Sequence, residues 1–391
     1  MRCLLRTLPL LLPLLGACAA TPPAPRPPDS RPTHATTQHH IVTPIVDGTP
    51  AELLARAERA LLAQRWQQAV DALLALLLAE PDGPHVEQAL LDLGIALEGL
   101  GDREKARVRY RELVKRFPDG PSAKQALVRE ATVNAYLEDW PALGETGAAL
   151  LARKDLDDVD RMLALGARGL SKIEAGEDVA ASKDVHDGLD LVDQLHYGAE
   201  NRLPVAAAQL RFAQGEIRRV RSERIGFVPV TPDFLVKIEL RCQMLLEAQG
   251  SFADAIRSVD PVWAKMSGYR VGEMYRVLHK DLMAIPPTEQ AKTEHDRQLF
   301  YAIMHVRYRA LLDKGVEMMR RTLALAEKTD DKAWVRRAEA AKKEMEDALV
   351  EERAQLARFP FTEAEVERAL AIMKEGIDKK KRDAERKAAK P

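Results

Sequence analysis

The side chains in this sequence most suited to binding a metal or transferring a proton are its nine histidines. His279, His295 and His305 occur in predicted helices, but no spacing places two of them on adjacent turns, as a His-Glu-x-x-His zinc site requires. The histidines of residues 34–40 occur in a proline-rich stretch without a nearby cysteine or a positioned carboxylate. The sequence therefore predicts no metal site and no cofactor.

Nucleophilic and phosphate-binding motifs are equally scarce. Cys242 has no histidine near it in sequence, and no serine stands in a Gly-x-Ser-x-Gly elbow. The Gly99-Leu100-Gly101 segment lacks the lysine and the serine or threonine of a phosphate-binding loop. We expect Cys242 to be a small buried hydrophobe and the protein not to be an enzyme. An enzyme with an unrecognised site is the alternative.

An internal repeat organises the middle of the chain. The motif Pro-Asp-Gly-Pro at residues 81–84 returns at 118–121, and Gln-Ala-Leu at 88–90 returns at 125–127. Both motifs return after 37 residues, and a fixed period of about this length is typical of a solenoid built from stacked helical hairpins. Apolar periodicity predicts one helix from about 86 to 100 and a second from 103 to 117.

The pattern within this hairpin resembles the tetratricopeptide repeat. That family places small residues where the two helices cross, an aromatic residue four positions later, and a closing proline, because a close crossing needs a small side chain. The matching residues are Leu93, Gly94, Ala106, Tyr110 and Pro118. The resemblance implies an all-α fold: a right-handed α-solenoid of such hairpins, followed by longer C-terminal helices.

Three repeats are predicted, with a fourth, divergent one at 155–198, so that residues 49–198 form the repeat region. By resemblance, the first helix of each hairpin lines a partner-binding groove. An alternative is that several of these side chains pack against the next hairpin. The groove positions are Leu54, Glu58, Leu61, Leu91, Ile95, Glu98, Val128, Thr132 and Ala135. Aliphatic residues mixed with glutamates suit an extended or helical peptide that carries basic residues.

The N-terminal residues 1–17 are predicted to be a targeting segment. Residues 1–17 have two arginines and an apolar run too short to span a bilayer. Leu15-Gly16-Ala17-Cys18 resembles the bacterial lipobox, which makes Cys18 the lipidation site; an ordinary cleaved signal peptide is the alternative. By resemblance, Ala19 after the cysteine implies the outer membrane, with the protein on its periplasmic side. Residues 18–48, rich in proline, are predicted to be a tether.

The remainder is predicted as a connecting helix and seam at 199–230, a helical region at 231–378 and a basic tail at 379–391. Thr231-Pro232 should begin a helix, Gly250 should break a hairpin, and Thr362 to Glu365 should form a capping box. The arginines of residues 218–224 are predicted to form a solvated face, and contact with an acidic partner or lipid headgroups is the alternative.

The predicted function is a non-catalytic scaffold that binds other envelope proteins. Net charge is −1, which argues against nucleic acid as a partner. The repeats resemble those of tetratricopeptide lipoproteins of Gram-negative bacteria. Residues 268–273 and 334–338 resemble segments of lipoproteins in the gliding machinery of social soil bacteria. The alternative function is an accessory subunit for outer-membrane β-barrel assembly or polysaccharide export.

Overall fold

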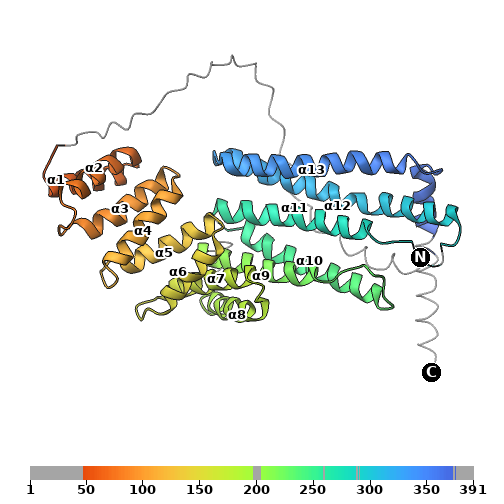
Figure 1. Cartoon of the computed structure of the whole chain (residues 1–391), viewed down its shortest axis with the longest axis horizontal. Helices are drawn as coiled ribbons and strands as arrows, with labels where there is room; N and C mark the ends of the chain where they lie inside the picture. The colour runs from red at the N-terminus through yellow and green to blue at the C-terminus, as the bar shows by residue number, and fades with distance from the viewer. Residues whose placement is uncertain are drawn as a thin grey trace, which may run out of the picture. The chain divides into compact units, whose positions relative to one another are not determined.

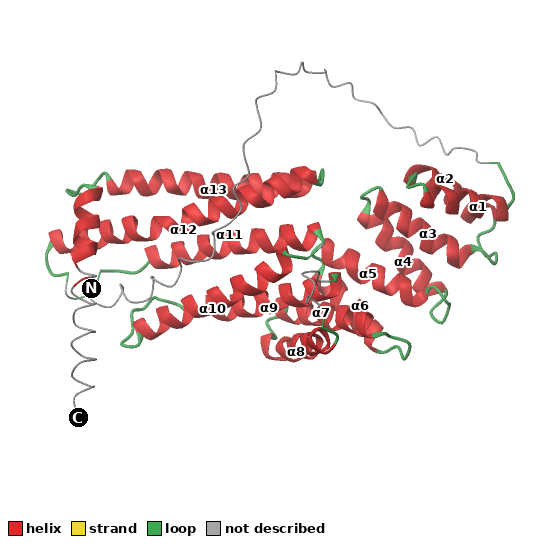
Figure 2. Cartoon of the chain, turned by 180° about the vertical axis from the view of Figure 1, so that it is seen from behind, coloured by secondary structure: helices red, strands yellow, loops and turns green. Residues whose placement is uncertain are grey.

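Helices make up every regular element in the part of the chain that the structure, a computed structural model, describes (Figures 1 and 2). The described residues are 47–196, 204–258, 260–287, 289, 291–372 and 375. The all-α prediction is confirmed, with short helical hairpins followed by longer helices. The predicted signal peptide, Cys18, the tether up to residue 46 and the basic tail lie outside the described residues.

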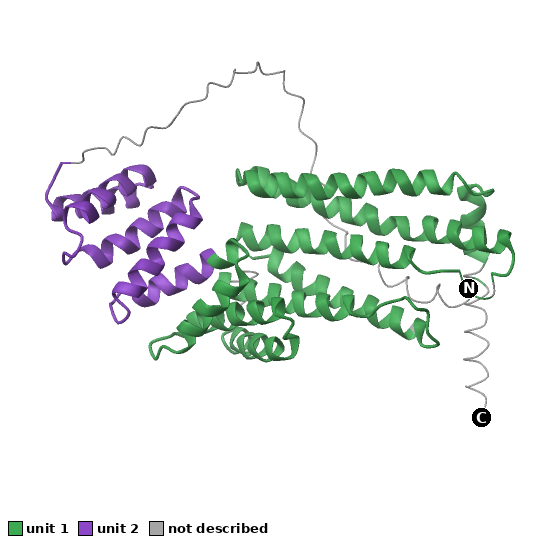
Figure 3. Cartoon of the chain, viewed as in Figure 1, with its two compact units in different colours: residues 1–9, 134–391 green, residues 10–133 purple. Residues whose placement is uncertain are grey.

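The chain divides into two compact units (Figure 3). Unit 2 comprises residues 10–133 and is described from residue 47; unit 1 comprises residues 134–391 together with residues 1–9. Helix α5 contains residues of both units.

Unit 2 contains the helices of the sequence repeat. They are α1 (Pro50–Leu62), α2 (Trp66–Ala79), α3 (Val86–Gly99), α4 (Arg103–Arg116) and α5 (Ala123–Tyr136). A capping box begins α1: the Thr49 side chain accepts a hydrogen bond from the Glu52 amide, and the Glu52 carboxylate accepts one from the Thr49 amide. Asp102 caps α4 in a simpler way, through the amide of Lys105.

Glycine lets the paired helices of unit 2 approach closely. A Cβ atom on Gly94 would lie 2.2 Å from the ring of Tyr110, and one on Gly99 would lie 2.3 Å from the ring of Trp66. Tyr110 is fully buried as a result. The small residue predicted at the helix crossing therefore supports the aromatic side chain of the next helix.

The repeated Pro-Asp-Gly-Pro turns have the same backbone bonds. Gly83 N–H donates to the Glu80 carbonyl at 3.2 Å, and Gly120 N–H donates to the Phe117 carbonyl at 3.1 Å. Each turn is also held by a side chain from a neighbouring helix. Arg116 Nη2 donates to the Pro81 carbonyl at 2.6 Å, while the Ser122 amide donates to Glu87 at 2.7 Å.

Unit 1 begins with shorter helices and continues with longer ones. They are α6 (Trp140–Leu151), α7 (Asp158–Glu174), α8 (Asp178–Gln194), α9 (Val205–Glu223), α10 (Phe234–Ile256), α11 (Pro261–Met283), α12 (Glu294–Lys328) and α13 (Lys332–Leu356). A further helical stretch covers residues 363–372.

The last three long helices pack in chain order, α11 on α12 and α12 on α13 (Figure 1). One core cluster between them contains Leu312, Val316, Met319 and Met345. Glycine again permits close approach, since a Cβ on Gly315 would lie 2.7 Å from the Met345 sulfur. In the described part of the chain, no helix is both long enough and apolar enough to cross a membrane.

Three local predictions in unit 1 have different outcomes. Gly250 does not break a hairpin, because α10 continues through it to Ile256 and buries Ala248 and Phe252 on either side. Helix α10 begins at Phe234 rather than at Pro232, so the predicted start was two residues early. The capping box at the last helix is confirmed, with the Thr362 amide donating to Glu365 at 2.8 Å.

Candidate functional site

The structure spreads the predicted groove positions over exposed, half-buried and buried classes. Glu58 is exposed, whereas Leu91 and Ala135 are buried. Ala135 belongs to unit 1, whereas the other eight positions belong to unit 2. The half-buried positions are Leu54, Leu61, Ile95, Glu98, Val128 and Thr132.

Glu98 on α3 is held by two side chains from later helices. The Tyr110 hydroxyl on α4 donates to its carboxylate, and Arg129 Nη1 on α5 lies 3.1 Å from the same oxygen. Burial raises the pKa of the Tyr110 hydroxyl far above its usual value, and the neighbouring Glu98 charge adds to that shift. Glu98 therefore links three helices as well as contributing charge to this face.

Asp92, one helical turn and a half before Glu98, is the most unusual polar residue of unit 2. It is 6% exposed, and its only described hydrogen bond comes from Gln88 Nε2, which donates to Oδ1 at 2.9 Å. Its second oxygen, Oδ2, has no hydrogen-bond partner among the described residues. Burial raises the pKa of the Asp92 carboxyl, the Glu58 charge raises it further, and the Gln88 bond and the Arg129 charge oppose the rise.

These interactions bring α1, α3 and α5 of unit 2 to one acidic face, which we define as Glu58, Asp92, Glu98 and Arg129. The face has three carboxyl groups and one guanidinium, and the Arg129 guanidinium pairs with Glu98. A buried carboxylate oxygen without a donor costs free energy, about 1–3 kcal/mol for an ordinary polar group and more for a charged one. Because Oδ2 is itself covered from solvent, a cationic side chain at this face would pair with exposed Glu58 and offset the buried Asp92 charge through its field.

Sequence reasoning missed Asp92 and Arg129. Asp92 interrupts the apolar run of residues 89–97, and a charged residue at a core position of a helix is the signal that could have identified it. Replacing Ile95 and Glu98 with lysine would break the Tyr110 and Arg129 contacts, whereas Glu58 is exposed and offers a cleaner substitution.

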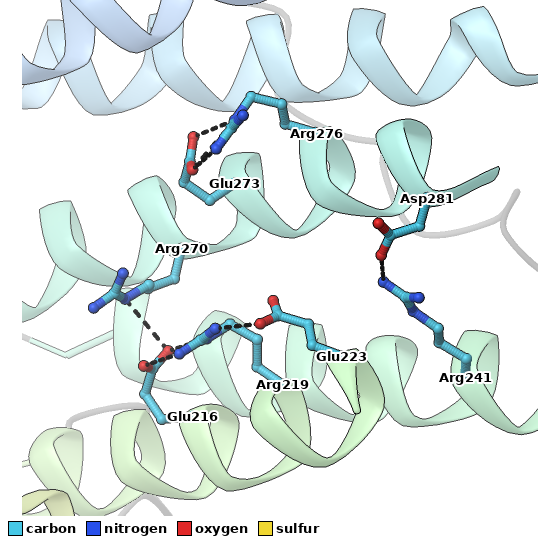
Figure 4. Close-up of polar contacts among 8 residues, drawn as sticks. All are labelled: Glu216, Arg219, Glu223, Arg241, Arg270, Glu273, Arg276 and Asp281. Atoms are coloured by element: carbon cyan, nitrogen blue, oxygen red, sulfur yellow. Dashed lines mark hydrogen bonds and ion pairs between the residues drawn. The ribbon is translucent and has the colours of Figure 1, made fainter. Parts of the chain in front are cut away.

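The arginines of residues 218–224 have partners within unit 1. Arg219 lies between Glu216 at 2.9 Å and Glu223 at 2.7 Å, as Figure 4 shows. Burial disfavours the charge of Arg219, but the two carboxylates outweigh it and raise its pKa above the usual value. Arg221 and Arg224 both bind Asp178 on α8, and Arg218 donates to Ser251 on α10. The predicted solvated basic face is therefore an ion-paired packing surface.

Further ionic contacts join α9, α10 and α11 (Figure 4). Arg270 on α11 lies 3.4 Å from Glu216 on α9. Arg241 on α10, 1% exposed, binds Asp281 on α11 and the Ile225 carbonyl, and its guanidinium stacks 4.7 Å from the Phe227 ring centroid. These contacts position helices and leave little charge for a ligand.

Two histidines that no sequence motif links, His279 and His305, share one carboxylate. His279 on α11 lies 3.3 Å from Glu352 Oε1, and His305 on α12 lies 2.5 Å from Glu352 Oε2, with all three side chains largely buried. No group of three His, Cys, Asp or Glu side chains in the described ranges could hold a metal ion. Cys242 is buried, as expected, and burial raises the pKa of its thiol against the charges of Arg241 and Arg307.

Comparison with known proteins supports the repeat assignment. A family model described as tetratricopeptide repeat matches residues 88–120, which cover α3, α4 and the following turn. No curated protein matches the chain. Among solved structures, a tetratricopeptide repeat protein from Parabacteroides merdae is 13% identical, with a TM-score of 0.43 over 75% of this chain and 98% of that chain. Residues 88–120 thus match one tetratricopeptide repeat, a module that typically binds other proteins and is generally non-catalytic.

Proposed function

We propose that this protein is a non-catalytic scaffold whose acidic face in unit 2 binds a partner segment carrying lysine or arginine. The observation that carries the proposal is the buried Asp92 carboxylate, whose Oδ2 lacks a donor while Glu58 and Glu98 add negative charge nearby. A partner ammonium or guanidinium group would pair with exposed Glu58 and offset the covered Asp92 charge without contacting Oδ2. Half-buried Leu54 and Ile95 offer apolar contacts on the same helices.

Two substitutions test this face, with one matched control. Glu58→Lys reverses an exposed charge, and Asp92→Asn removes a buried charge while keeping the side-chain shape. Asp119→Lys is the control, because Asp119 is exposed in the turn after α4. Cross-linking and pull-down from membranes with the mature protein should recover partners with wild type and Asp119→Lys. We expect recovery to fall about tenfold with each of the other two.

A compensating change in the recovered partner gives the stricter test. Reversing its basic residues to glutamate should abolish binding to wild type and restore binding to Glu58→Lys. Asp92→Asn should not lower the melting temperature, since it removes a buried charge without breaking an ion pair. Equal recovery of the same partners by all variants would contradict the proposal.

We also propose that the protein is anchored to the outer membrane and faces the periplasm. The lipobox-like residues 15–18 support this, with Cys18 as the acylated residue and the proline-rich stretch as the tether. Cys18→Ala should move the protein from the outer-membrane fraction to the soluble periplasmic fraction. Retention of Cys18→Ala in the membrane fraction would count against a lipid anchor.

Within the envelope, the proposal extends to a role in gliding motility. Its support is the resemblance of residues 268–273 and 334–338, two segments that pack together in unit 1. The Tyr269 and Trp334 ring centroids lie 5.8 Å apart, and the Arg337 guanidinium lies over both rings. Deleting the gene should stop or slow single-cell movement. Unchanged movement would direct attention to barrel-protein levels and surface polymer, which test the alternative role.

A further inference from the structure

A basic hollow between α1 and α2 has no part in the acidic face. Its volume is about 430 Å³, and its lining residues are Arg56, Arg59, Ala60, Arg65, Gln68 and Asp71. Three arginines and one acidic residue, Asp71, thus line the hollow. The Asp71 carboxylate already accepts a hydrogen bond from Gln67 at 2.8 Å.

The three arginines make few hydrogen bonds within the described residues. Arg56 Nη2 donates to the Asp47 carbonyl at 3.2 Å, and Arg59 Nε donates to the Ala55 carbonyl at 3.1 Å. No described carboxylate lies within ion-pair distance of either, and the Arg65 side chain has no described hydrogen bond. Each guanidinium carries five N–H donors, so most of the donors around the hollow are available to a ligand.

Other arginines of unit 2 are placed differently. Five of those on α4 and α5 reach carboxylates on their own or neighbouring helices, or in the turn after α2. The pairs are Arg107 with Glu104, Arg109 with Glu112, Arg111 with Glu130, Arg116 with Asp82, and Arg129 with Glu98. On α1, Glu52 lies one turn before Arg56, but its carboxylate is occupied by Thr49 in the capping box. The excess positive charge is therefore local to the α1–α2 hollow.

We infer that this hollow binds a phosphate monoester group. A carboxylate presents two oxygens and one negative charge, too few to satisfy three guanidiniums that already outnumber Asp71. A phosphate monoester presents three terminal oxygens and a charge of about −1.5 to −2, which matches the excess. Arginine forks bind such oxygens in pairs, which gives geometric fit as well as attraction.

The phosphate could belong to a lipid headgroup or to a small soluble ester, and one neighbour separates the two sources. Leu62 lies one turn after Arg59 on α1 and is 87% exposed. An exposed leucine beside a basic hollow would enter the interfacial region of a membrane and add apolar contact there. It would contribute nothing to binding a small soluble ester.

The experiment uses the mature chain from residue 18 with Cys18→Ala, so that neither an acyl chain nor the apolar run of residues 1–17 contributes. Calorimetric titration with glycerol 3-phosphate tests the soluble source, with succinate as the carboxylate comparison. Co-sedimentation with phosphatidylcholine vesicles, with and without phosphatidic acid, tests the headgroup source. We expect Arg56→Gln/Arg59→Gln/Arg65→Gln to weaken phosphate binding by roughly tenfold or more in whichever arm binds.

Two further variants keep the result interpretable. Lys183→Gln/Arg161→Gln/Arg336→Gln removes the same charge from three exposed cations of unit 1 and should leave binding unchanged. Arg65→Gln alone removes a side chain without a described partner, so it should weaken binding even if the triple variant folds poorly. Leu62→Ser should reduce vesicle binding if the source is a headgroup and leave glycerol 3-phosphate binding intact.

Binding in either arm that is lost with the arginines supports the site and identifies its source. Binding of neither probe would overturn it. So would binding that survives the triple glutamine variant, or succinate binding as tight as that of glycerol 3-phosphate. Because the acidic face shares none of these residues, failure here leaves the partner-binding proposal standing, and the reverse also holds.

Discussion

Helices of unit 2 are fitted together mainly by shape, whereas the long helices of unit 1 are also joined by buried charge. In unit 2, Gly94 and Gly99 give room to the rings of Tyr110 and Trp66. Cationic side chains that pair across its helices remain partly exposed to solvent: the Arg111 side chain, paired with Glu130, is 46% exposed. In unit 1, Lys265 is 2% exposed and binds Asp331 at 2.7 Å.

The two kinds of contact differ in how far apart in the sequence their two residues lie. Gly94 and Tyr110 belong to one hairpin, while Lys265 and Asp331 are 66 residues apart and join α11 to the start of α13. Long helices with similar apolar stripes can slide past one another by a turn with little loss of burial. A buried ion pair penalises such a shift, because both charges would lose their partners. We interpret the ionic contacts of unit 1 as fixing the register of its helices.

The largest predicted effect is that of Lys265→Met. Removing one member of a buried pair typically lowers the free energy of unfolding by about 3–5 kcal/mol, because the remaining charge loses its counter-ion. Denaturant unfolding measures the change. The matched control is Lys343→Met, whose pair with Asp347 is exposed on both sides and should cost less than about 1 kcal/mol. Equal effects of the two variants would remove the distinction between buried and exposed ion pairs on which this account of unit 1 depends.

Acid unfolding gives the next effect. Burial opposes ionisation of Glu352, but the hydrogen bond from His305, the close contact with His279 and the charges of both rings outweigh it and lower the Glu352 pKa to about 2. Because this folded-state pKa lies below the usual 4.5, the stability from Glu352 is complete above pH 4.5 and is lost as the pH falls toward 2. The loss is about 3 kcal/mol, at about 1.4 kcal/mol per pKa unit.

Comparing variants isolates that contribution from other carboxylates. Glu352→Gln should be less stable than wild type at neutral pH, and the difference should shrink as the pH falls from 4.5 to 2. Glu351→Gln changes the exposed neighbour and should follow the wild-type curve. Chemical unfolding at several pH values supplies the data, and a difference independent of pH would argue against the His-Glu-His contact.

The smallest effect concerns shape packing in unit 2. Gly94→Ala would place a methyl group 2.2 Å from the Tyr110 ring and should lower the melting temperature, at a cost of about 1–3 kcal/mol. Gly250→Ala is the control, because a Cβ there meets nothing within 4 Å in the middle of α10. It should stabilise the helix by about 0.5–1 kcal/mol. Opposite signs for the two alanines would sharpen the comparison; a neutral Gly94→Ala would weaken it.

Sequence patterns located the repeat hairpin closely. The predicted helices at about 86–100 and 103–117 are observed as Val86–Gly99 and Arg103–Arg116. Both are bounded by strong local signals, a Gly-Asp turn and a closing proline. At Gly250 the same reasoning failed, because a helix that buries Ala248 and Phe252 on both sides outweighs the cost of one glycine. Local signals thus predicted boundaries where packing agreed with them.

The sequence by itself determined the helical fold class, the repeat period and the small-residue crossing at Gly94, because each depends on neighbours within about one hairpin. Tertiary structure alone decided that Asp92 lacks a donor, that the arginines of residues 218–224 are paired, and that His279 and His305 meet at Glu352. The physical reason is that burial and charge pairing depend on helices brought together from distant parts of the chain. Periodicity within one helix carries no information about which charge it will face.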